Sequence, residues 1–479
     1  MKVLLTSLRF LRQGQAFPPA SERKRLERYR NNRLLFEGEH ALVYREAFRR
    51  IERVIGNFEE VISYGVIFNY QKLMSLKTAD FVCASPPRIT VADDAKQKLI
   101  DKILQETDFY RKLYCSVLDI SRYGDSVFQV SKGKDSKPEL TVISPKYWFP
   151  VVDGDNIRKF AYHVFAWRYI INADRKQYGL AVQIHKPDEP GVCECHRYEL
   201  RGQKGSFSVG KELTRKKEIS LETEMNVCPV FVVSNVPTSD NPFGQDDYDS
   251  IDSIISELCV RVSQIEKVLD KFSNPTMAGS ANLLERDEIT GEYHFRYGNF
   301  VPLVDGDAPP EMIVWNADME ANFKMIELLI NQLYALSEMG SAAFGDLSHS
   351  AGNVTSGSAL RRLMISPLAK ARRIAMHYEK PIREMLSLCA AVYGVTIEPQ
   401  EITVQWNDGL PADPMEEANI LNLRTGGKAT LSRYTALRRF DGMSDSDADE
   451  ELAAIEQEDA SIGMGNAPVN EPESVAVDE

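Results

Sequence analysis

Apolar residues in the first quarter of the chain recur at intervals of three and four, which predicts helices. The segments with this spacing are 40–55, 68–84, 94–106 and 108–123. The last of them ends at Gly124, and glycine commonly follows a helix because it tolerates the left-handed backbone of a helix end. We therefore expect residues 20–125 to be helical.

The pattern changes between residues 126 and 235. β-Branched and aromatic runs alternate there with turn-forming residues such as Asp153-Gly154-Asp155, which predicts antiparallel hairpins. The runs are SVFQVSK, LTVISP, KYWFPVV, FAYHVFAWRYII, YGLAVQIH and PVFVVSN. Residues 201–224 are polar, and we expect them to form a mobile loop.

Two longer helical patterns follow, on either side of a turn-rich insert at 274–316. Their apolar positions alternate in steps of three and four, which predicts narrow apolar seams. The first seam is Ile251, Ile255, Leu258, Val262, Ile265, Leu269 and Phe272, and the second is Met319, Phe323, Ile326, Ile330 and Leu333. We expect Gly340 to cap the second helix.

The rest of the chain has shorter elements. Residues 341–357 are small and polar, without an apolar period, which predicts a flexible loop. Residues 358–393 return to helix, and Pro367 and Pro381 should each kink it because proline lacks a backbone donor. A strand is expected at 402–406, with short helices at about 413–424, 430–440 and 447–459. Residues from about 462 lack the apolar groups needed for ordering.

Charge is distributed unevenly. Residues 441–479 hold thirteen Asp or Glu and no Lys or Arg, so the first 440 residues are neutral although the whole chain has a net charge of −13. Tight DNA binding normally requires a basic surplus, so any contact with nucleic acid should be weak.

No run approaches the ~20 apolar residues of a membrane span. Seven dispersed cysteines are typical of reduced thiols in a cytoplasm.

Common catalytic motifs are missing from the sequence. There is no GxxxxGK[ST], HExxH, GxSxG or paired CxxC, so we expect no catalytic residues, no metal and no cofactor. His185, Cys193, Cys195 and His196 offer four soft metal ligands, but the C-x-C-H spacing is not a standard zinc motif. Reduced thiols and surface imidazoles in a hairpin are the plainer interpretation. The basic stretch at 361–373 can touch phosphate or form a solvated helix face.

Several strings along the chain resemble phage portal proteins. They occur in the family's order and span nearly the whole chain, from Gly38 to about Asp459. They are DISRYGDSVFQV (119–130), ISPKYWFPVVD (143–153), SNVPTSDNPFGQDDYDSIDSIISELCVRVSQIEKVL (234–269), NVTSGSALRRLM (353–364), ATLSRYTALRR (429–439) and SDADEELAAIEQE (446–458).

The resemblance implies an α+β, mainly helical portal fold, with wing, stem, clip and crown around an axial channel. The implied division is wing 1–236, first stem helix 237–273, clip 274–318, second stem helix 319–340, tunnel loop 341–357, long kinked helix and returning wing strand 358–410, crown 411–461 and acidic tail 462–479. We recognise the clip by its placement alone.

The resemblance also implies the function. Portal proteins form a ring, usually of twelve subunits, at one capsid vertex, where double-stranded DNA enters and leaves. The implied partners are the terminase large subunit, a head-completion or adaptor protein, and the major capsid and scaffolding proteins, with no membrane. The protein would be assembled in the host cytoplasm and reside in the virion. Candidate DNA contacts in the tunnel loop are Ser348, His349, Ser350, Asn353 and Thr355, with Arg361 and Arg362 at the following helix start.

Two alternatives stay open from the residues alone. One is another structural head protein, such as a minor capsid or adaptor subunit, against which two long helices around an insert of about 45 residues argue. The other is a DNA-processing enzyme, against which the missing nucleotide loop and metal cluster argue. Arg361 and Arg362 can face DNA or pair with carboxylates of a neighbouring subunit.

Overall fold

The computed structural model describes residues 4–49, 66–133, 135–189, 192–203, 206–219, 227–273, 276–278, 284–286, 293–295, 311–313, 319–346, 361–407, 414–426, 429–439, 443 and 445–464. The chain divides into two units. The larger comprises Met1–Ala351 and Leu363–Gly409, and the smaller comprises Gly352–Arg362 and Leu410–Glu479. Each unit is described by itself below.

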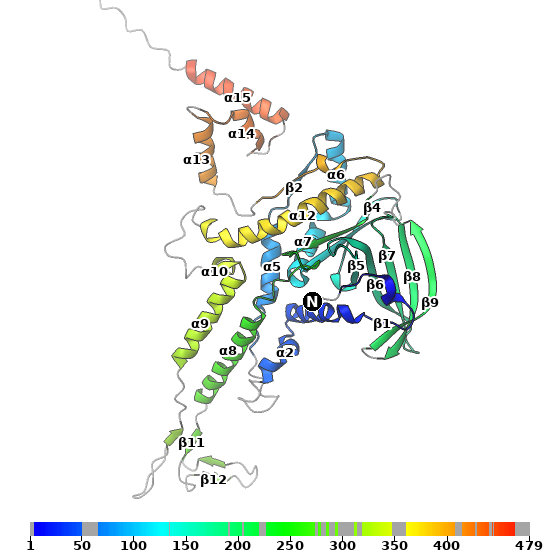
Figure 1. Ribbon diagram of the computed structural model, residues 1–479. Coiled ribbons are helices and arrows are strands. Elements are labelled where there is room, and N and C mark those ends of the chain that lie inside the picture. Colours follow the sequence, from blue (N-terminus) through cyan, green and yellow to red (C-terminus); the bar gives the residue numbers. More distant parts are fainter. Residues whose placement is uncertain are drawn as a thin grey trace, which may run out of the picture. The chain divides into compact units, whose positions relative to one another are not determined.

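The larger unit begins with the predicted group of helices (Figure 1). They are α1 (Arg23–Glu37), α2 (His40–Val43), α5 (Tyr70–Cys83), α6 (Asp94–Glu106) and α7 (Phe109–Tyr123). Gly124 follows α7 with φ +83°, and its N–H donates to the Ile120 carbonyl at 2.9 Å. The prediction that the helix ends at this glycine is confirmed.

Antiparallel strands follow. The alternating pattern predicted β3 (Asp125–Lys132), β4 (Pro138–Ile143), β5 (Trp148–Val152), β6 (Phe160–Asn172), β7 (Gln177–His185) and β10 (Val230–Ser234). The structure adds β8 (Val192–Gln203), β9 (Ser206–Ile219) and, from the start of the chain, β1 (Ala16–Phe17). One sheet has the order β1-β9-β8-β7-β6-β5, and a smaller one has the order β10-β3-β4.

The mobile loop predicted for residues 201–224 is wrong over its described part. Residues 206–219 form β9, which pairs antiparallel with β8 from Val192↔Ile219 to Gln203↔Ser206. The side chains at 211–216 are exposed, which is why the strand can accommodate the charged segment KELTRKKEI. Its regular backbone comes from pairing with β8 and not from burial of its own side chains.

The large sheet is covered on both of its faces. Phe10, Leu11 and Phe17 from the start of the chain pack on Val164 and Val182 of the large sheet. On the other face, Trp148 and Phe165 pack with the small sheet through Val127 and Val230, and with Phe243. A third core joins α5, α6 and α7 to the small sheet.

Two long helices lie side by side farther along the chain (Figure 1). They are α8 (Asp252–Ser273) and α9 (Met319–Leu336), and both seam predictions are confirmed as helix. Between them the structure describes four short strands in antiparallel pairs, β11 with β14 and β12 with β13. These are β11 (Thr276–Ala278), β12 (Leu284–Arg286), β13 (Tyr293–Phe295) and β14 (Glu311–Ile313).

The expected end of the second long helix needs correction. α9 ends at Leu336, and Gly340 begins a short helix, α10 (Gly340–Ala343), instead of capping α9. The chain turns at Glu338, whose φ is +60°, and Ser337 Oγ donates to the Tyr334 carbonyl at 2.9 Å. A polar side chain and a left-handed residue therefore end this helix where the pattern had suggested glycine.

The next long helix, α12 (Ile365–Val392), contains Pro381 in its interior as predicted. Pro367 behaves differently from the expected kink, because it lies in the first turn of α12, where no backbone donor is required. The predicted strand at 402–406 is present as β15 (Thr403–Gln405), which pairs antiparallel with β2 (Arg88–Thr90).

Besides the helical residues 361 and 362, the described part of the smaller unit contains three helices. They are α13 (Pro414–Thr425), α14 (Arg433–Arg439) and α15 (Asp445–Met464). α15 extends through residues 462–464, which were expected to be disordered, and the rest of the acidic tail lies outside the described residues. The chain thus combines helices and antiparallel sheets in an α+β fold. No helix among the described residues is long and apolar enough to cross a membrane.

Candidate functional site

An acidic segment at the start of α8 forms ion pairs with residues of other elements of the larger unit. We call Asp246, Asp247 and Asp252, with the side chains that bind them, the α8 junction. The segment reaches this place through two glycines. A Cβ on Gly244 would lie 2.0 Å from the Gly124 carbonyl oxygen, and a Cβ on Gly124 would lie 2.7 Å from the backbone of Gly244. Only glycines allow this close approach.

Asp247 forms a deeply buried ion pair with α12. The Lys370 Nζ lies 3.0 Å from Asp247 Oδ1, and the two side chains are 3% and 6% exposed. Asp247 also accepts hydrogen bonds from Ser121 at 2.7 Å and from Asn235 at 3.1 Å. The lysine joins α12 to the start of α8, and a buried ion pair of this kind is costly to break on one side.

Arg28 of α1 binds two carboxylates of the α8 junction. Its guanidinium donates to both oxygens of Asp246, at 3.0 and 2.7 Å, and to Asp252 at 2.7 Å. Burial by itself lowers the pKa of Arg28, but the hydrogen bonds and charges of Asp246 and Asp252 outweigh it and raise the pKa. Tyr44, which follows α2, donates to Asp252 at 3.0 Å, and Gln71 of α5 donates to it at 3.3 Å, so this carboxylate has partners from both α1 and α5.

Asp125, the first residue of β3 in the small sheet, binds the segment that precedes α8. It accepts from Tyr29 at 3.1 Å, from Ser234 at 2.7 Å and from the Gly244 backbone at 2.9 Å. Burial raises the pKa of this carboxyl, and its donors only partly offset that effect. Strands β3 and β10 and helix α1 are therefore tied to the segment that enters α8.

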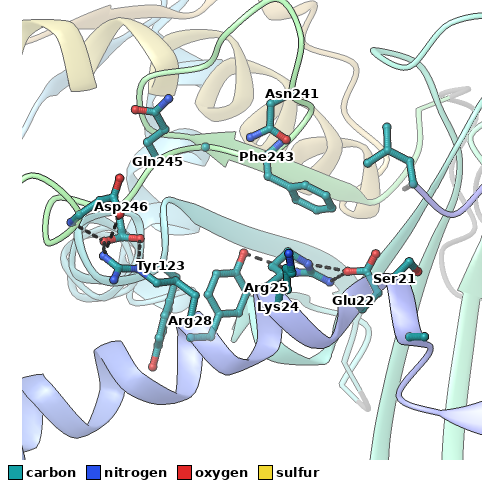
Figure 2. Close-up of a pocket in the computed structure, with 15 residues that line it drawn as sticks. Ser21, Glu22, Lys24, Arg25, Arg28, Tyr123, Asn241, Phe243, Gln245 and Asp246 are labelled. Atoms are coloured by element: carbon teal, nitrogen blue, oxygen red, sulfur yellow. Dashed lines mark hydrogen bonds and ion pairs between the residues drawn. The ribbon is translucent and has the colours of Figure 1, made fainter. Parts of the chain in front are cut away.

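A cavity of about 730 Å³ lies beside the junction, between the start of α1 and residues 241–249. Figure 2 shows Arg28 pointing from α1 toward Asp246, with Arg25 and Phe243 farther along the same cavity. Arg25 donates to Glu22 at 2.6 Å and to the Trp148 carbonyl at 2.8 Å, and it lies 4.6 Å from the centre of the Phe243 ring. Both guanidinium groups are thus bound by acceptors of the same chain.

The paired groups of the α8 junction suit a mechanical connection between elements better than a catalytic site. Every charge of the junction described above has an opposite charge or a donor within hydrogen-bond distance, and the groups come from α1, α5, α7, α12 and the small sheet. Buried networks of paired charges favour one arrangement of the elements that they join. The junction therefore sets the position of the first turns of α8 relative to the rest of the larger unit.

The predicted contact residues are only partly described. Ser348, His349, Ser350, Asn353 and Thr355 lie outside the described residues. Arg361 and Arg362 are exposed helical residues of the smaller unit. The stretch 361–373 is not one solvated face, because Lys370 is buried and Arg373 pairs with Glu338, with one contact of 3.2 Å.

The four soft metal ligands seen in the sequence do not gather in one place. His185 and Cys193 lie opposite each other on β7 and β8, whereas His196 lies on the other face of β8 and contacts Glu212 at 2.7 Å. No group of three or more His, Cys, Asp or Glu among the described residues can hold a metal ion.

Sequence reasoning missed the α8 junction, although the run DDYDSID and the basic start of α1 were visible in the sequence.

The chain matches the model of one protein family and is similar to chains of solved structures. The model of the family described as phage portal protein, SPP1 Gp6-like, matches residues 19–463. The search of curated proteins finds no match. A solved chain from the neck of an empty GTA particle, computed with C6 symmetry, is 13% identical with a TM-score of 0.45, over 81% of this chain and 95% of that one. A chain from the neck of a native GTA particle, computed with C12 symmetry, is 12% identical with a TM-score of 0.42, over 77% and 88%.

Proposed function

Because the chain belongs to the SPP1 Gp6-like family of phage portal proteins, we propose that its copies form a closed ring of about twelve subunits at one capsid vertex. Double-stranded DNA passes through the axial channel of this ring during packaging and ejection. The observation that carries the proposal is the family match, which covers residues 19–463 and so includes most of both units.

The proposed domains follow the expected division. Residues 1–236 form the wing, 237–273 and 319–340 carry the two stem helices, 274–318 the clip, 341–357 the tunnel loop, 358–410 the kinked helix with the returning strand, and 411–461 the crown. The packing of α8 against α9 supports the stem assignment. The α8 junction would then attach the stem to the wing and transmit load between them while DNA moves.

The ring acts without catalysis in this proposal. The clip docks the terminase large subunit during packaging and later a head-completion or adaptor protein, while the wing meets the major capsid and scaffolding proteins. The motor hydrolyses ATP. A neutral body with an acidic end keeps phosphate contacts weak, so DNA can slide.

The clip assignment is tested by deleting residues 279–310, which lie between β11 and β14. Because α8 and α9 and the α8 junction stay intact, the variant should still form rings but should fail to bind terminase and to package DNA. A deletion variant that packages DNA at the parental level would contradict the assignment.

The tunnel-loop assignment needs a shortening that spares α10. Ala343 is buried and the Phe344 ring stacks on Tyr334 at 5.4 Å, so residues 341–346 should be kept. Shortening within 347–357 should leave rings intact but impair packaging or retention of DNA. Full packaging and retention by shortened rings would refute the proposal, as would failure of cysteines at 349 and 353 to cross-link to packaged DNA.

The two arginines after the loop are tested in the same assay. If Arg361 and Arg362 face DNA, the double change R361A/R362A should slow packaging with the ring intact. If they pair with a neighbouring subunit, ring assembly should weaken instead. Arg372→Ala is the matched control, because Arg372 is also exposed and belongs to α12 in the larger unit.

A further inference from the structure

Two thiols lie side by side on strand β8. Cys193 and Cys195 are two residues apart and point to the same face of the strand, with 3.7 Å between their Sγ atoms. Cys193 is buried, whereas Cys195 is partly exposed, and neither forms a disulfide. One thiol is therefore accessible to a solute, and the other lies directly behind it.

The surroundings differ between the two sulfurs. His185 Nε2 lies 3.6 Å from Cys193 Sγ. Burial lowers the pKa of His185 to about 4, so the imidazole is neutral at pH 7 and can accept the S–H proton in a hydrogen bond. Cys195 faces Lys216 across the β8–β9 pair, and a neighbouring ammonium favours the thiolate that attacks disulfides.

We propose that Cys193 and Cys195 form a reversible dithiol–disulfide couple that reacts with low-molecular-weight disulfides. The Cys195 thiolate attacks one sulfur of the small disulfide, which forms a mixed disulfide and releases one thiolate. Cys193 then loses its proton and attacks the Cys195 sulfur, which releases the second thiolate. The two cysteines lose two electrons and two protons, and the small disulfide is reduced to two thiols.

The strand geometry makes this couple easily reversible. Residues two apart on a strand have Cα atoms about 6.6 Å apart, which is at the long end of the range that disulfides span. Closing the bond must therefore shorten β8 locally, and strained disulfides are the readily reduced ones. The couple responds to the redox state of its surroundings and adds no permanent cross-link.

The test uses the assembled full-length protein and oxidised glutathione. After incubation and blocking of remaining thiols, trypsin releases the peptide spanning 177–197, which contains both cysteines. We expect this peptide to lose two hydrogens and two blockable thiols, and to regain both on treatment with reduced glutathione. A peptide that keeps both thiols, or two copies of it joined to each other, would overturn the proposal.

Single variants separate the two steps. Cys193→Ser should accumulate a stable glutathione adduct at Cys195, because the second attack is lost. Cys195→Ser should give no adduct at the buried Cys193. Cys115→Ser removes an exposed thiol elsewhere and should leave the 177–197 peptide reacting as in the parent. An adduct on Cys193 in the Cys195→Ser variant would contradict the proposed order of attack.

The role of Lys216 is tested by rate. Lys216→Glu should slow the first step several-fold and leave the final oxidised peptide unchanged. Lys211→Glu is the matched control, because Lys211 is exposed on the same strand but does not face Cys195. Equal slowing by both variants would show that only net charge matters and would remove the assigned role of Lys216.

Discussion

The start of α8 and the surface of α9 have similar apolar patterns but different surroundings. Ile251 and Ile255 are 0% exposed and pack within the larger unit, whereas Phe323 and Leu328 of α9 are 54% and 52% exposed in the single chain. Helical periodicity marks an apolar face without saying what covers it. The start of α8 is covered by its own chain, and α9 keeps apolar side chains available for another surface.

The comparison also separates two kinds of contact. The first turns of α8 are held by buried ion pairs and hydrogen bonds with defined geometry, which suits a fixed joint. The exposed side of α9 carries large apolar side chains such as Phe323, Met325 and Leu328, which suit side-by-side packing in the ring proposed above. Changes at the junction should therefore destabilise the single chain, and changes on α9 should act on assembly.

The largest effect is expected from breaking the buried pair at the junction. Lys370→Ala leaves the Asp247 carboxylate buried without its cation, which costs about 3–5 kcal/mol in the free energy of unfolding. Denaturant titration of the variant measures the loss. Arg372→Ala, an exposed neighbour on α12, should change stability by less than about 0.5 kcal/mol. Equal stability of the two variants would contradict the assigned joint.

The second effect depends on pH and concerns buried histidines away from the junction. Burial lowers the pKa of His163 to about 3 and that of His185 to about 4. Both stay neutral in the folded protein, while the unfolded chain takes up protons below pH ~6.5. The contribution of these two histidines to the unfolding free energy is therefore complete above that pH. It is lost as pH falls, by about 2 kcal/mol per histidine at pH 5.

Substitution at one of these histidines checks the sign. His163 accepts a hydrogen bond from the Trp148 indole at 3.2 Å, and His163→Gln retains an acceptor without the titration. The difference between the unfolding free energies at pH 7 and pH 5 should be about 2 kcal/mol smaller in this variant than in the parent. An unchanged pH dependence would show that His163 does not contribute.

The third change tests the exposed side of α9. Leu328→Lys should leave the unfolding free energy of the single chain within about 0.5 kcal/mol. It should weaken each subunit contact in the ring by about 1–2 kcal/mol, because burying the leucine is lost and a lysine must be desolvated. Gln332→Lys is the control, because Gln332 is an exposed polar residue of the same helix. Analytical ultracentrifugation compares their assembly.

The smallest effect is expected from a substitution that keeps the positive charge but loses the hydrogen-bond geometry. Arg28→Lys retains one cation but cannot bind Asp246 through two parallel hydrogen bonds and Asp252 through a third. We expect a loss of about 1 kcal/mol, measured by thermal unfolding. Arg30→Lys, on the exposed side of α1, should be neutral, and a similar loss there would assign the effect to helix propensity.

Much of the fold could be predicted from the sequence. Apolar periodicity located α5, α6, α7, α8 and α9, and turn residues separated the strands of the β region. The pattern failed at β9, because an exposed strand can carry a polar sequence and gain its regularity from pairing with β8. It also misplaced the end of α9, where Ser337 and Glu338 terminate the helix without glycine.

The junction could not be predicted in the same way. Asp247 and Lys370 are 123 positions apart in the sequence numbering, and nothing local distinguishes Lys370 from the exposed Arg372 two residues later. Pairing across such separations depends on tertiary packing. The candidate DNA contacts Ser348, His349, Ser350, Asn353 and Thr355 stay predictions, because they rest on family resemblance and lie outside the described residues.

The most direct test of the account is electron microscopy of the purified full-length protein, with its mass measured in the same buffer. We expect closed rings of about twelve chains, pierced by an axial channel and stable at several salt concentrations. Only monomers or dimers at every salt and protein concentration, or closed particles without a channel, would contradict it.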